Sequence, residues 1–390
     1  MGASGGLAAR YRVVIAGGGV AALEAALTLR EVGAARVATT LLTPQTSFVH
    51  RPLNVLEPFP GGGGRRYELA TVARSAGARL CRDALASVDT QRRVVYTAHG
   101  QTLHYDGLLL AYGSAVSERF RHARTVDDEY LAVRLRGIVQ DVEDGYVRRV
   151  AFVAAPPLAW PLPLYELALM TSRAAYDTSA QVSVFLVTPE DAPLEVFGDA
   201  ASRAVSGLLR RHHVEMITAP ACQVPAPGKV EVGPDRPALR VQSVVAMPEL
   251  APRPVTGVPA VHGSGFIEVD EKCRVVGLPG VYAAGDATAF PVKHGSIAAL
   301  QADTAAIELA RLAGAEIPSQ PFRPVLEGML LGGDRPLYLT ARLNMSGRPL
   351  DSAVSDTPPR HPTGKIGARR LGRYLHHADQ LSGSFSQAAL

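Results

Sequence analysis

The stretch Tyr11–Arg30, YRVVIAGGGVAALEAALTLR, decides the fold of this chain. The run Val13–Ile15 is β-branched and typical of a buried strand. Glycines at 17–19 interrupt it, and residues 21–29 are strong helix formers with apolar side chains on more than one face. A strand, a glycine turn and a helix in this order predict an α/β fold built on a parallel sheet.

The turn has the spacing G-x-G-x-x-A, carried by Gly17, Gly19 and Ala22, with Val20 and Ala21 between the last two. Gly17 allows the tight turn, Gly19 lets the backbone approach a pyrophosphate, and Ala22 lets the helix pack closely on the strand. The phosphates would then lie at the positive end of the helix dipole. A plain glycine turn is the alternative, but the flanking strand and helix favour dinucleotide binding.

Composition limits the class of protein. A length of 390 residues predicts two or three domains, and 47 % hydrophobic with 19 % charged residues is typical of a globular protein. No apolar run approaches the ~20 residues of a membrane span, and a net charge of +4 does not indicate nucleic-acid binding. Cys81, Cys222 and Cys273 lack metal-site spacing, so we expect no metal and buried thiols in a reducing cytoplasm.

A second strand is expected at Arg36–Leu42, followed by Thr43 and Pro44. A dinucleotide fold usually carries an acidic residue here, about twenty residues past the glycines, to bind the adenosine ribose. This chain has none at that place, so we expect Thr43 or Gln45 to make the bond instead.

Two later segments carry a resemblance to a known family. Leu85–Ser114 indicates three short strands and ends in Ala-Tyr-Gly-Ser, and 279–290, PGVYAAGDATAF, indicates a strand that ends in Gly-Asp. With the first glycine turn, these segments resemble the FAD-dependent pyridine nucleotide-disulfide oxidoreductases, flavoproteins with two dinucleotide-binding domains. Tyr112 stands where that family has a threonine.

The resemblance implies FAD as the cofactor. It also implies a long helix from Gly295-Ser296 whose N-terminus points at the pyrimidine edge of the flavin, and an aspartate, Asp286, that bonds the ribityl chain. The residues assigned to FAD are Gly17, Gly19, Val20, Ala21, Ala22, Thr43, Pro44, Arg51, Val88, Ala111, Tyr112, Gly113, Gly285, Asp286, Lys293, Gly295 and Ser296. His50 is expected beside Arg51, near the pyrophosphate or the flavin edge.

The resemblance further implies an α/β fold with two Rossmann-like FAD/NAD(P)-binding domains, the second inserted in the first, plus a small C-terminal α+β element. The expected divisions are an FAD-binding domain at 1–118 and 256–317, an NAD(P)-type domain at 119–255, and a C-terminal element covering the flavin at 318–390. In the second domain we expect a helix at 164–172. In the C-terminal element we expect strands, a mobile loop at 346–365 and an Arg/His-rich helix at 366–378.

Within the family, the chain is most similar to the sulfide:quinone reductase, flavocytochrome c sulfide dehydrogenase and type II NADH dehydrogenase branch. It lacks that branch's redox cysteines, because Trp160 lies in the region of one and no cysteine follows Cys273. Pro156–Pro163 replaces the second glycine motif, and prolines offer no backbone N–H to a pyrophosphate. Glu190 and Asp191 could meet a ribose or form a solvated loop, and the solvated loop is favoured.

Four residues are candidates for catalysis, each with a structural alternative. Glu166 is either a proton shuttle near the flavin or an acid at a helix N-terminus. Lys293 lies either near flavin N1 and O2 or on the surface before a helix. Tyr112 lies next to the ring or only packs there, and Trp160 either stacks on an aromatic substrate or a quinone or fills space between prolines.

The sequence thus predicts a cytoplasmic FAD-dependent dehydrogenase that passes a hydride or electrons from a small organic substrate through flavin N5 to a quinone, oxygen or another acceptor. One alternative is a peripheral-membrane quinone reductase, which would need an apolar amphipathic helix near the C-terminus. Another is a non-catalytic flavin-binding module whose second domain binds a protein partner. A homodimer is left open, and neither nucleic acid nor an integral membrane span is expected.

Overall fold

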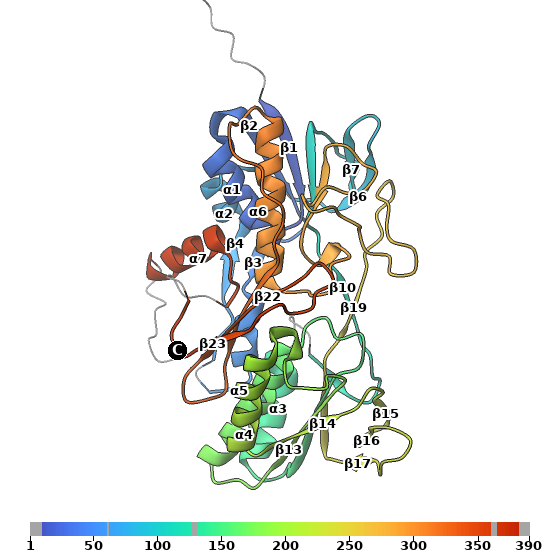
Figure 1. Cartoon of the computed structure of the whole chain (residues 1–390), viewed down its shortest axis with the longest axis vertical. Helices are drawn as coiled ribbons and strands as arrows, with labels where there is room; N and C mark the ends of the chain where they lie inside the picture. Colours follow the sequence, from blue (N-terminus) through green and yellow to red (C-terminus); the bar gives the residue numbers. More distant parts are fainter. Residues whose placement is uncertain (1–9, 61, 127–130, 360–364, 382–390) are drawn as a thin grey trace, which may run out of the picture.

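The computed structural model describes residues 10–60, 62–126, 131–359 and 365–381. Two lobes lie along the long axis of the molecule (Figure 1). The upper lobe contains helices α1 (Val20–Gly33) and α6 (Gly295–Leu312), and the lower lobe contains α3 (Leu131–Glu143), α4 (Leu162–Asp177) and α5 (Asp199–Arg211).

The upper lobe is built on a five-stranded parallel sheet in the order β20-β9-β1-β2-β5. Its strands are β1 (Tyr11–Ala16), β2 (Val37–Leu42), β5 (Arg79–Cys81), β9 (Gly107–Leu110) and β20 (Val281–Ala283). Val13 and Ile15 pack in one core cluster with α1 and α6, and Val14 and Ala16 pack in another with strands β6 (Leu85–Asp89), β7 (Val94–Thr97) and β8 (Thr102–His104). Burial on both faces explains the continuously apolar strand.

The lower lobe contains a second parallel sheet in the order β11-β18-β12-β13-β14. Its strands are β11 (Arg124–Thr125), β18 (Ser243–Ala246), β12 (Arg149–Val153), β13 (Ser183–Thr188) and β14 (Val214–Thr218). Side chains of α4 and α5 pack in one cluster with this sheet. The other face packs on a small sheet of β15 (Gln223–Ala226), β16 (Lys229–Glu231) and β17 (Leu239–Arg240).

The order of the strands confirms the predicted insertion. β9 precedes every strand of the second sheet in the chain and β20 follows them all, yet β9 and β20 pair in the first sheet. The domain boundaries at residues 118, 255 and 317 stay a prediction.

The C-terminal element joins the two lobes. It is a sheet of β21 (Val325–Leu330), β22 (Leu337–Arg342) and β23 (Ala353–Ser355), followed by α7 (Arg369–Leu381), which contacts α1. β21 contacts both α4 and α6 (Figure 1). The remaining elements are β3 (Ser47–Val49) paired with β4 (Arg66–Glu68), α2 (Leu69–Ser75), β10 (Ala115–Ser117) paired with β19 (Glu249–Ala251), and short 3-10 turns, among them η2 (Arg51–Leu56) and η4 (Gly285–Ala287).

Several predicted boundaries differ from the structure, among them those of α4, of the last helix and of the loop at 346–365. α4 begins at Leu162, two residues early, because Pro163 lies in the first turn, where a missing N–H breaks no helical bond. The last helix begins at Arg369 and not at 366, since Gly367 has φ +68°. The predicted loop at 346–365 contains strand β23, and residues 360–364 lie outside the described residues.

None of the helices within the described ranges combines the length and the hydropathy that crossing a bilayer requires.

Candidate functional site

The carboxyl ends of adjacent strands meet at one edge of the first sheet. The backbone N–H groups of Gly17, Ala111 and Ala284 donate to the last carbonyl of β2, β1 and β9 respectively, at 2.8, 2.8 and 3.0 Å. These bonds bring the predicted glycine turn, the Ala-Tyr-Gly-Ser segment and the Gly-Asp loop together. Ligands of open parallel sheets bind at this edge.

The glycine turn is packed on one side and open on the other. Gly17 has φ +143°, and a Cβ there would lie 2.1 Å from the carbonyl oxygen of Ala111, so only glycine fits. A Cβ on Gly19 would meet no atom within 4 Å. Gly19 therefore faces open space at the start of α1, where free backbone N–H groups attract an anion.

Thr43 and Gln45 lie against the middle of this turn. Thr43 is 1 % exposed directly after β2, and its hydroxyl accepts the backbone N–H of Gln45 at 3.3 Å. A Cβ on Gly18 would lie 2.7 Å from Thr43 Oγ1 and 2.9 Å from Gln45 Oε1. Both residues are thus close enough to the turn for the predicted ribose contact, with Pro44 between them.

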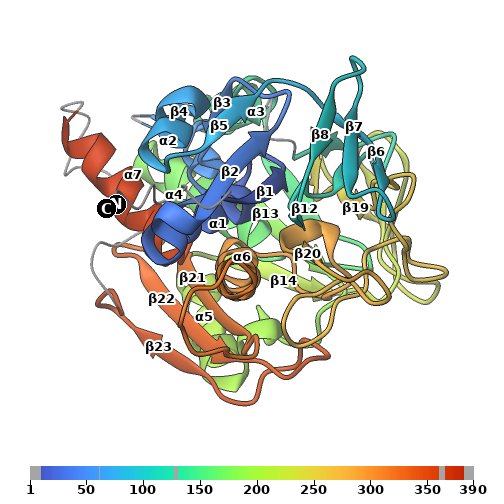
Figure 2. The same cartoon turned by 90° about the horizontal axis from the view of Figure 1, so that it is seen from above.

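The Gly-Asp loop lies between two helix N-termini. Gly285 has φ +76°, and a Cβ there would lie 3.3 Å from the Cβ of Ala21 in α1 and 3.5 Å from that of Ala298 in α6. Its N–H donates to Gln301 Oε1 of α6 at 2.8 Å. The starts of α1 and α6 therefore converge on this loop, and the two helices lie side by side (Figure 2). Sequence reasoning missed Gln301, whose one signal is a polar residue in an otherwise apolar helical stretch.

α6 begins at Gly295, as predicted, and His294 caps it. His294 Nδ1 accepts the backbone N–H of Ser296 at 3.0 Å. Burial, with a smaller effect from the charge of Lys365, lowers the pKa of His294 to about 3, so the ring is neutral at physiological pH. Sequence reasoning assigned Ser296 to the cofactor but missed its capping partner.

Lys293 is buried, so the surface alternative for this residue is wrong. It is 8 % exposed, its ammonium donates to the Thr288 carbonyl, and Nζ lies 4.1 Å from the centroid of the Phe266 ring. Burial lowers the pKa of Lys293 to about 8, and the half-buried carboxylate of Asp286 opposes that shift. A lysine and an aspartate assigned to the cofactor are therefore electrostatic neighbours.

The proline-rich turn of the second lobe packs on the start of α6. The carbonyl of Ala159 accepts the backbone N–H of Lys293 at 3.1 Å. The Trp160 ring meets the His294 ring edge-on, with centroids 4.3 Å apart. Trp160 is half-buried and packs against the core, which agrees with the space-filling alternative. Stacking on a substrate stays a prediction.

Glu166 is buried inside the molecule and not at a helix terminus. It is 1 % exposed, and its Oε1 accepts from the Lys365 ammonium at 2.6 Å and from the Leu331 N–H at 2.9 Å. Burial raises the pKa of Glu166, while the Lys365 charge and both hydrogen bonds lower it. Its partners come from the C-terminal element, so they lie far from Glu166 in sequence and carry no local signal.

His50 is buried, and its ring stacks with that of Phe48 while its ring nitrogens lack a hydrogen-bond partner among the described residues. The residue is 7 % exposed. Burial, followed by the charges of Arg65 and Lys365, lowers its pKa to about 3. A neutral, unpaired imidazole here fits contact with a bound molecule. Arg51, the next residue, is exposed at the start of η2.

Three further predicted cofactor residues are Tyr112, Gly113 and Val88. Tyr112 is half-buried, and burial raises its pKa to about 12, so the phenol is neutral. Gly113 has φ +74° and faces open space. Val88 of β6 is 5 % exposed, and its N–H donates to the Thr256 carbonyl at 2.9 Å.

The position of Glu190, just after the second-lobe strand β13, differs from the one predicted. The favoured solvated loop is wrong for this residue, because Glu190 is 6 % exposed and its Oε2 accepts from the Tyr165 hydroxyl at 2.6 Å and from Thr188 Oγ1 at 2.9 Å. Burial raises its pKa to about 7. Asp191 is exposed. The second-lobe strand therefore ends in an internal hydrogen-bonded carboxylate.

The three thiols are free and buried in different core clusters. Cys81, Cys222 and Cys273 each pack in a separate cluster. Burial raises the pKa of all three, that of Cys222 to about 11. No cluster of metal-binding side chains occurs in the part of the chain that the structure describes.

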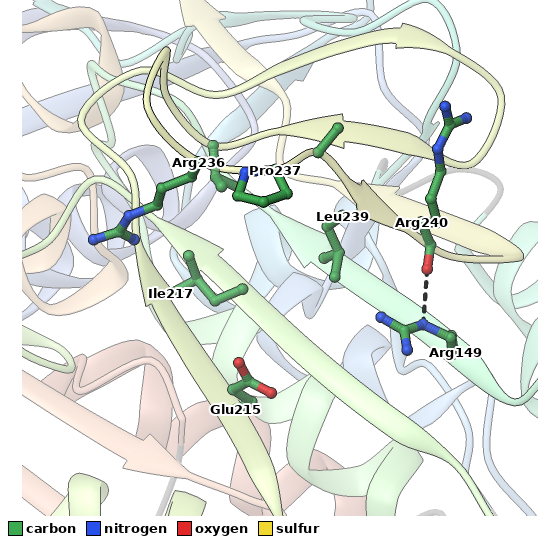
Figure 3. A pocket seen from close by; sticks show the side chains of 9 residues that line it. Arg149, Glu215, Ile217, Arg236, Pro237, Leu239 and Arg240 are labelled. Atoms are coloured by element: carbon green, nitrogen blue, oxygen red, sulfur yellow. Dashed lines mark hydrogen bonds between the residues drawn. The ribbon is translucent and has the colours of Figure 1, made fainter.

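A shallow hollow of about 630 Å³ lies elsewhere, on the lower lobe (Figure 3). Arg149 and Glu215, at the amino ends of β12 and β14, line it together with Ile217, Arg236 and Arg240. The Arg149 Nε donates to the Arg240 carbonyl at 2.7 Å. Ligands of such sheets bind at the opposite, carboxyl edge, so the hollow is separate from the candidate site.

Comparison with protein-family models finds no match, and comparison with curated proteins finds none either. Solved structures do match. The chain is similar to a sulfide:quinone oxidoreductase from Aquifex aeolicus, with TM-score 0.76 and 16 % identity over 95 % of this chain and 90 % of that one. It is also similar to a ferredoxin reductase from Rhodopseudomonas palustris, with TM-score 0.62 and 18 % identity over 85 % of this chain and 82 % of that one.

A further match is NDH2 from Plasmodium falciparum in complex with NADH, with TM-score 0.57 and 15 % identity over 72 % of this chain and 65 % of that one. These matches confirm the predicted fold with two Rossmann-like domains, and the predicted resemblance is confirmed at the level of the fold. At such identities the likeness shows the fold alone.

Proposed function

We propose that this protein is an FAD-dependent oxidoreductase that takes a hydride or electrons from a small organic substrate and passes them to a quinone, oxygen or another acceptor. The convergence of the starts of α1 and α6 on Gly285 carries this proposal. Helix N-termini stabilise negative charge. The start of α1 would therefore hold the pyrophosphate of FAD beside Gly19, and the start of α6 would favour negative charge at the pyrimidine edge of the flavin.

The residues present fit FAD. Gly19 leaves space for phosphate, Gly285 permits close approach between two helices, and the ring nitrogens of His50 lack a hydrogen-bond partner among the described residues. Thr43 or Gln45 would bind the adenosine ribose, and Asp286 the ribityl chain. When bound, FAD supplies two-electron oxidation of a substrate and transfer to an acceptor.

The chain's own side chains have separate roles in this proposal. Glu166 holds or moves a proton at its carboxylate, because a buried carboxyl between a cation and a backbone N–H can change its protonation state. Lys293 supplies positive charge near the α6 start. Trp160 and Tyr112 exclude water from the same region with their half-buried rings.

NADH is not the proposed reductant, although the NDH2 relative was solved with it. Proline residues at 156–163 remove backbone donors, this turn packs on Lys293 and His294, and one carboxylate oxygen of Glu190, Oε2, is bonded to Tyr165. The membrane alternative is also less favoured, since the apolar Leu371 and Leu375 of α7 are buried in the core.

Cofactor content tests the proposal. Gly19→Val adds a branched side chain in the open space next to the start of α1, where a Cβ meets nothing within 4 Å, so the fold should persist while FAD is lost. Gly207→Val is the matched control, since a Cβ there also meets nothing within 4 Å and the site lies in α5. The bound flavin is released and identified as FAD or FMN. Full FAD occupancy in Gly19→Val would contradict the assignment.

An anaerobic screen tests the reaction. The purified holoprotein is mixed with candidate metabolites, sulfide, NADH and NADPH while flavin absorbance is followed, and a quinone or oxygen is then added. Bleaching by a small organic compound and recovery with an acceptor are expected. For that substrate, Glu166→Gln should slow reduction about 10²-fold with FAD retained. A flavin that no organic compound bleaches would favour the non-catalytic alternative.

A further inference from the structure

The ion pair between Glu166 and Lys365 is buried on both sides. The two side chains are 1 % and 2 % exposed, and Nζ lies 2.6 Å from Oε1. α4 carries the glutamate, whereas the lysine precedes α7 at the other end of the chain. A pair this dry contributes little net stability, but removal of one partner leaves an uncompensated charge.

The chain around Lys365 is fixed on the start of α6. A Cβ on Gly295 would lie 3.1 Å from the carbonyl oxygen of Ile366, and a Cβ on Gly367 would lie 2.8 Å from the Cβ of Ser296. The segment 365–367 therefore crosses the helix N-terminus at close contact. Its path determines where the Lys365 ammonium can lie.

The ammonium also acts on two imidazoles. The charge of Lys365 contributes to the lowered pKa of both His50 and His294, so these rings stay neutral. In this group of four side chains, Glu166 and Lys365 are the two that are joined in an ion pair, and burial raises the pKa of the first and lowers that of the second. The proton state of the group therefore depends on the pair.

We propose that Lys365 is a positioning residue for Glu166: its charge keeps the carboxylate ionised, and its anchored backbone fixes that carboxylate beside the α6 start. The inference rests on the proposed function, in which Glu166 holds or moves a proton. The neutral histidines cannot replace the ammonium. Without Lys365, the Leu331 N–H is the hydrogen-bond donor that remains to Glu166 among the described residues, and burial favours the protonated form of this carboxyl.

Infrared difference spectroscopy of the full chain as purified tests the charge state of Glu166 directly, whether or not FAD is bound. Lys365→Met should give a band of a protonated buried carboxyl at neutral pH that the wild type lacks, and Lys365→Met/Glu166→Gln should lose this band. Lys365→Gln keeps a donor of smaller size without charge, so it gives a second variant if the Met form does not fold. A spectrum without the new band in the folded variant would overturn the proposal.

A pH profile separates positioning from a structural role. Protein reduced with dithionite is reoxidised with menadione, and the rate of flavin reoxidation is measured as a function of pH. The pH dependence of this rate should move toward higher pH by a unit or more in Lys365→Met, while Lys365→Arg keeps the wild-type dependence. Lys229→Met, on β16 in the other small sheet, should change nothing. A lowered melting temperature with an unmoved profile would mean that Lys365 is only structural. If FAD is absent from every form, the proposed function fails, whereas the infrared result still decides the charge of Glu166.

Discussion

The carboxylate of Glu24 in α1 accepts the backbone N–H of Arg370, 346 residues later in the chain, at 2.8 Å. It also accepts the N–H of Leu371 at 2.6 Å, so a buried acid from the first helix caps the last one. The Arg370 guanidinium forms ion pairs with two acids of the upper lobe, Glu31 and Asp303, each at 2.9 Å. The C-terminal helix is thus held by a charged network and not only by apolar packing.

Glu24→Gln should change how stability depends on pH. Burial, with a further contribution from Asp303, raises the pKa of Glu24 to about 7 from 4.5, against the opposing Arg370 and Leu371 contacts. The folded state therefore binds this proton more tightly, and stability falls as pH rises from 4.5 to about 7, by on the order of 3 kcal/mol. Urea unfolding of both proteins at about pH 5 and about pH 8 measures the difference. If the free energy of unfolding depended on pH identically in the two proteins, the raised pKa of Glu24 would be contradicted.

NADH and NADPH should reduce the bound flavin slowly at micromolar concentration. The prolines of the Pro156–Pro163 turn offer no backbone N–H to a phosphate, and the turn packs against Lys293 and His294. Stopped-flow absorbance measures the rate, and dithionite in the same protein is the positive control. Fast reduction by either nucleotide would refute the prediction, and Glu190 and Asp191 would then be the ribose contacts to mutate.

Lys293→Met should lower the reduction potential of the bound flavin. A unit charge about 4 Å away is worth at most about 4 kcal/mol at an effective dielectric of ~20, and solvent reduces this to roughly 1–2 kcal/mol, or roughly 20–45 mV for two electrons. Because the pKa of Lys293 is about 8, the difference from wild type should shrink above that pH. Spectroelectrochemical titration measures both effects, with Lys272→Met as control. An unchanged potential at neutral pH would place Lys293 away from the flavin.

Replacement of Cys81, Cys222 and Cys273 by alanine should leave flavin content and turnover nearly unchanged. The three thiols lie in separate core clusters and have raised pKa values, so they cannot form a relay. Stability should fall modestly, by about 1 kcal/mol per site for the small cavities left. Flavin absorbance and turnover with the substrate found in the screen are compared with wild type. Turnover lost while the flavin spectrum stays intact would show that a thiol takes part.

Local patterns predicted the parts of the site that lie at element boundaries. Gly17, Gly285 and Gly295 could be placed from sequence, because a tight turn, a close approach and a helix start each leave a short signature. Boundary errors remain at α4, where a tolerated proline lies in the first turn, and at α7, which begins after the left-handed Gly367 and is capped by the distant Glu24 carboxylate.

Pairings between distant segments could not be predicted. Lys365 and Glu166 are 199 residues apart, and nothing near Lys365 indicates a buried ammonium. Similarly, Glu190 in a Thr-Pro-Glu-Asp segment reads as solvated, and only the Tyr165 hydroxyl on the neighbouring helix makes it internal. Single-sequence periodicity reports which face of an element is apolar, and it does not report which polar group from elsewhere will meet it.

The edge position of β20 has a consequence for synthesis in the cell. β9 ends at residue 110, and β20, which pairs with it, begins only at residue 281. All strands of the second sheet lie between residues 124 and 246. Domains fold as units when their strands are available. On the ribosome the inserted lobe can therefore complete its sheet first, while the N-terminal lobe remains an unfinished half with an open edge. The lobe whose first strands are synthesised earliest is therefore the one that completes its sheet last.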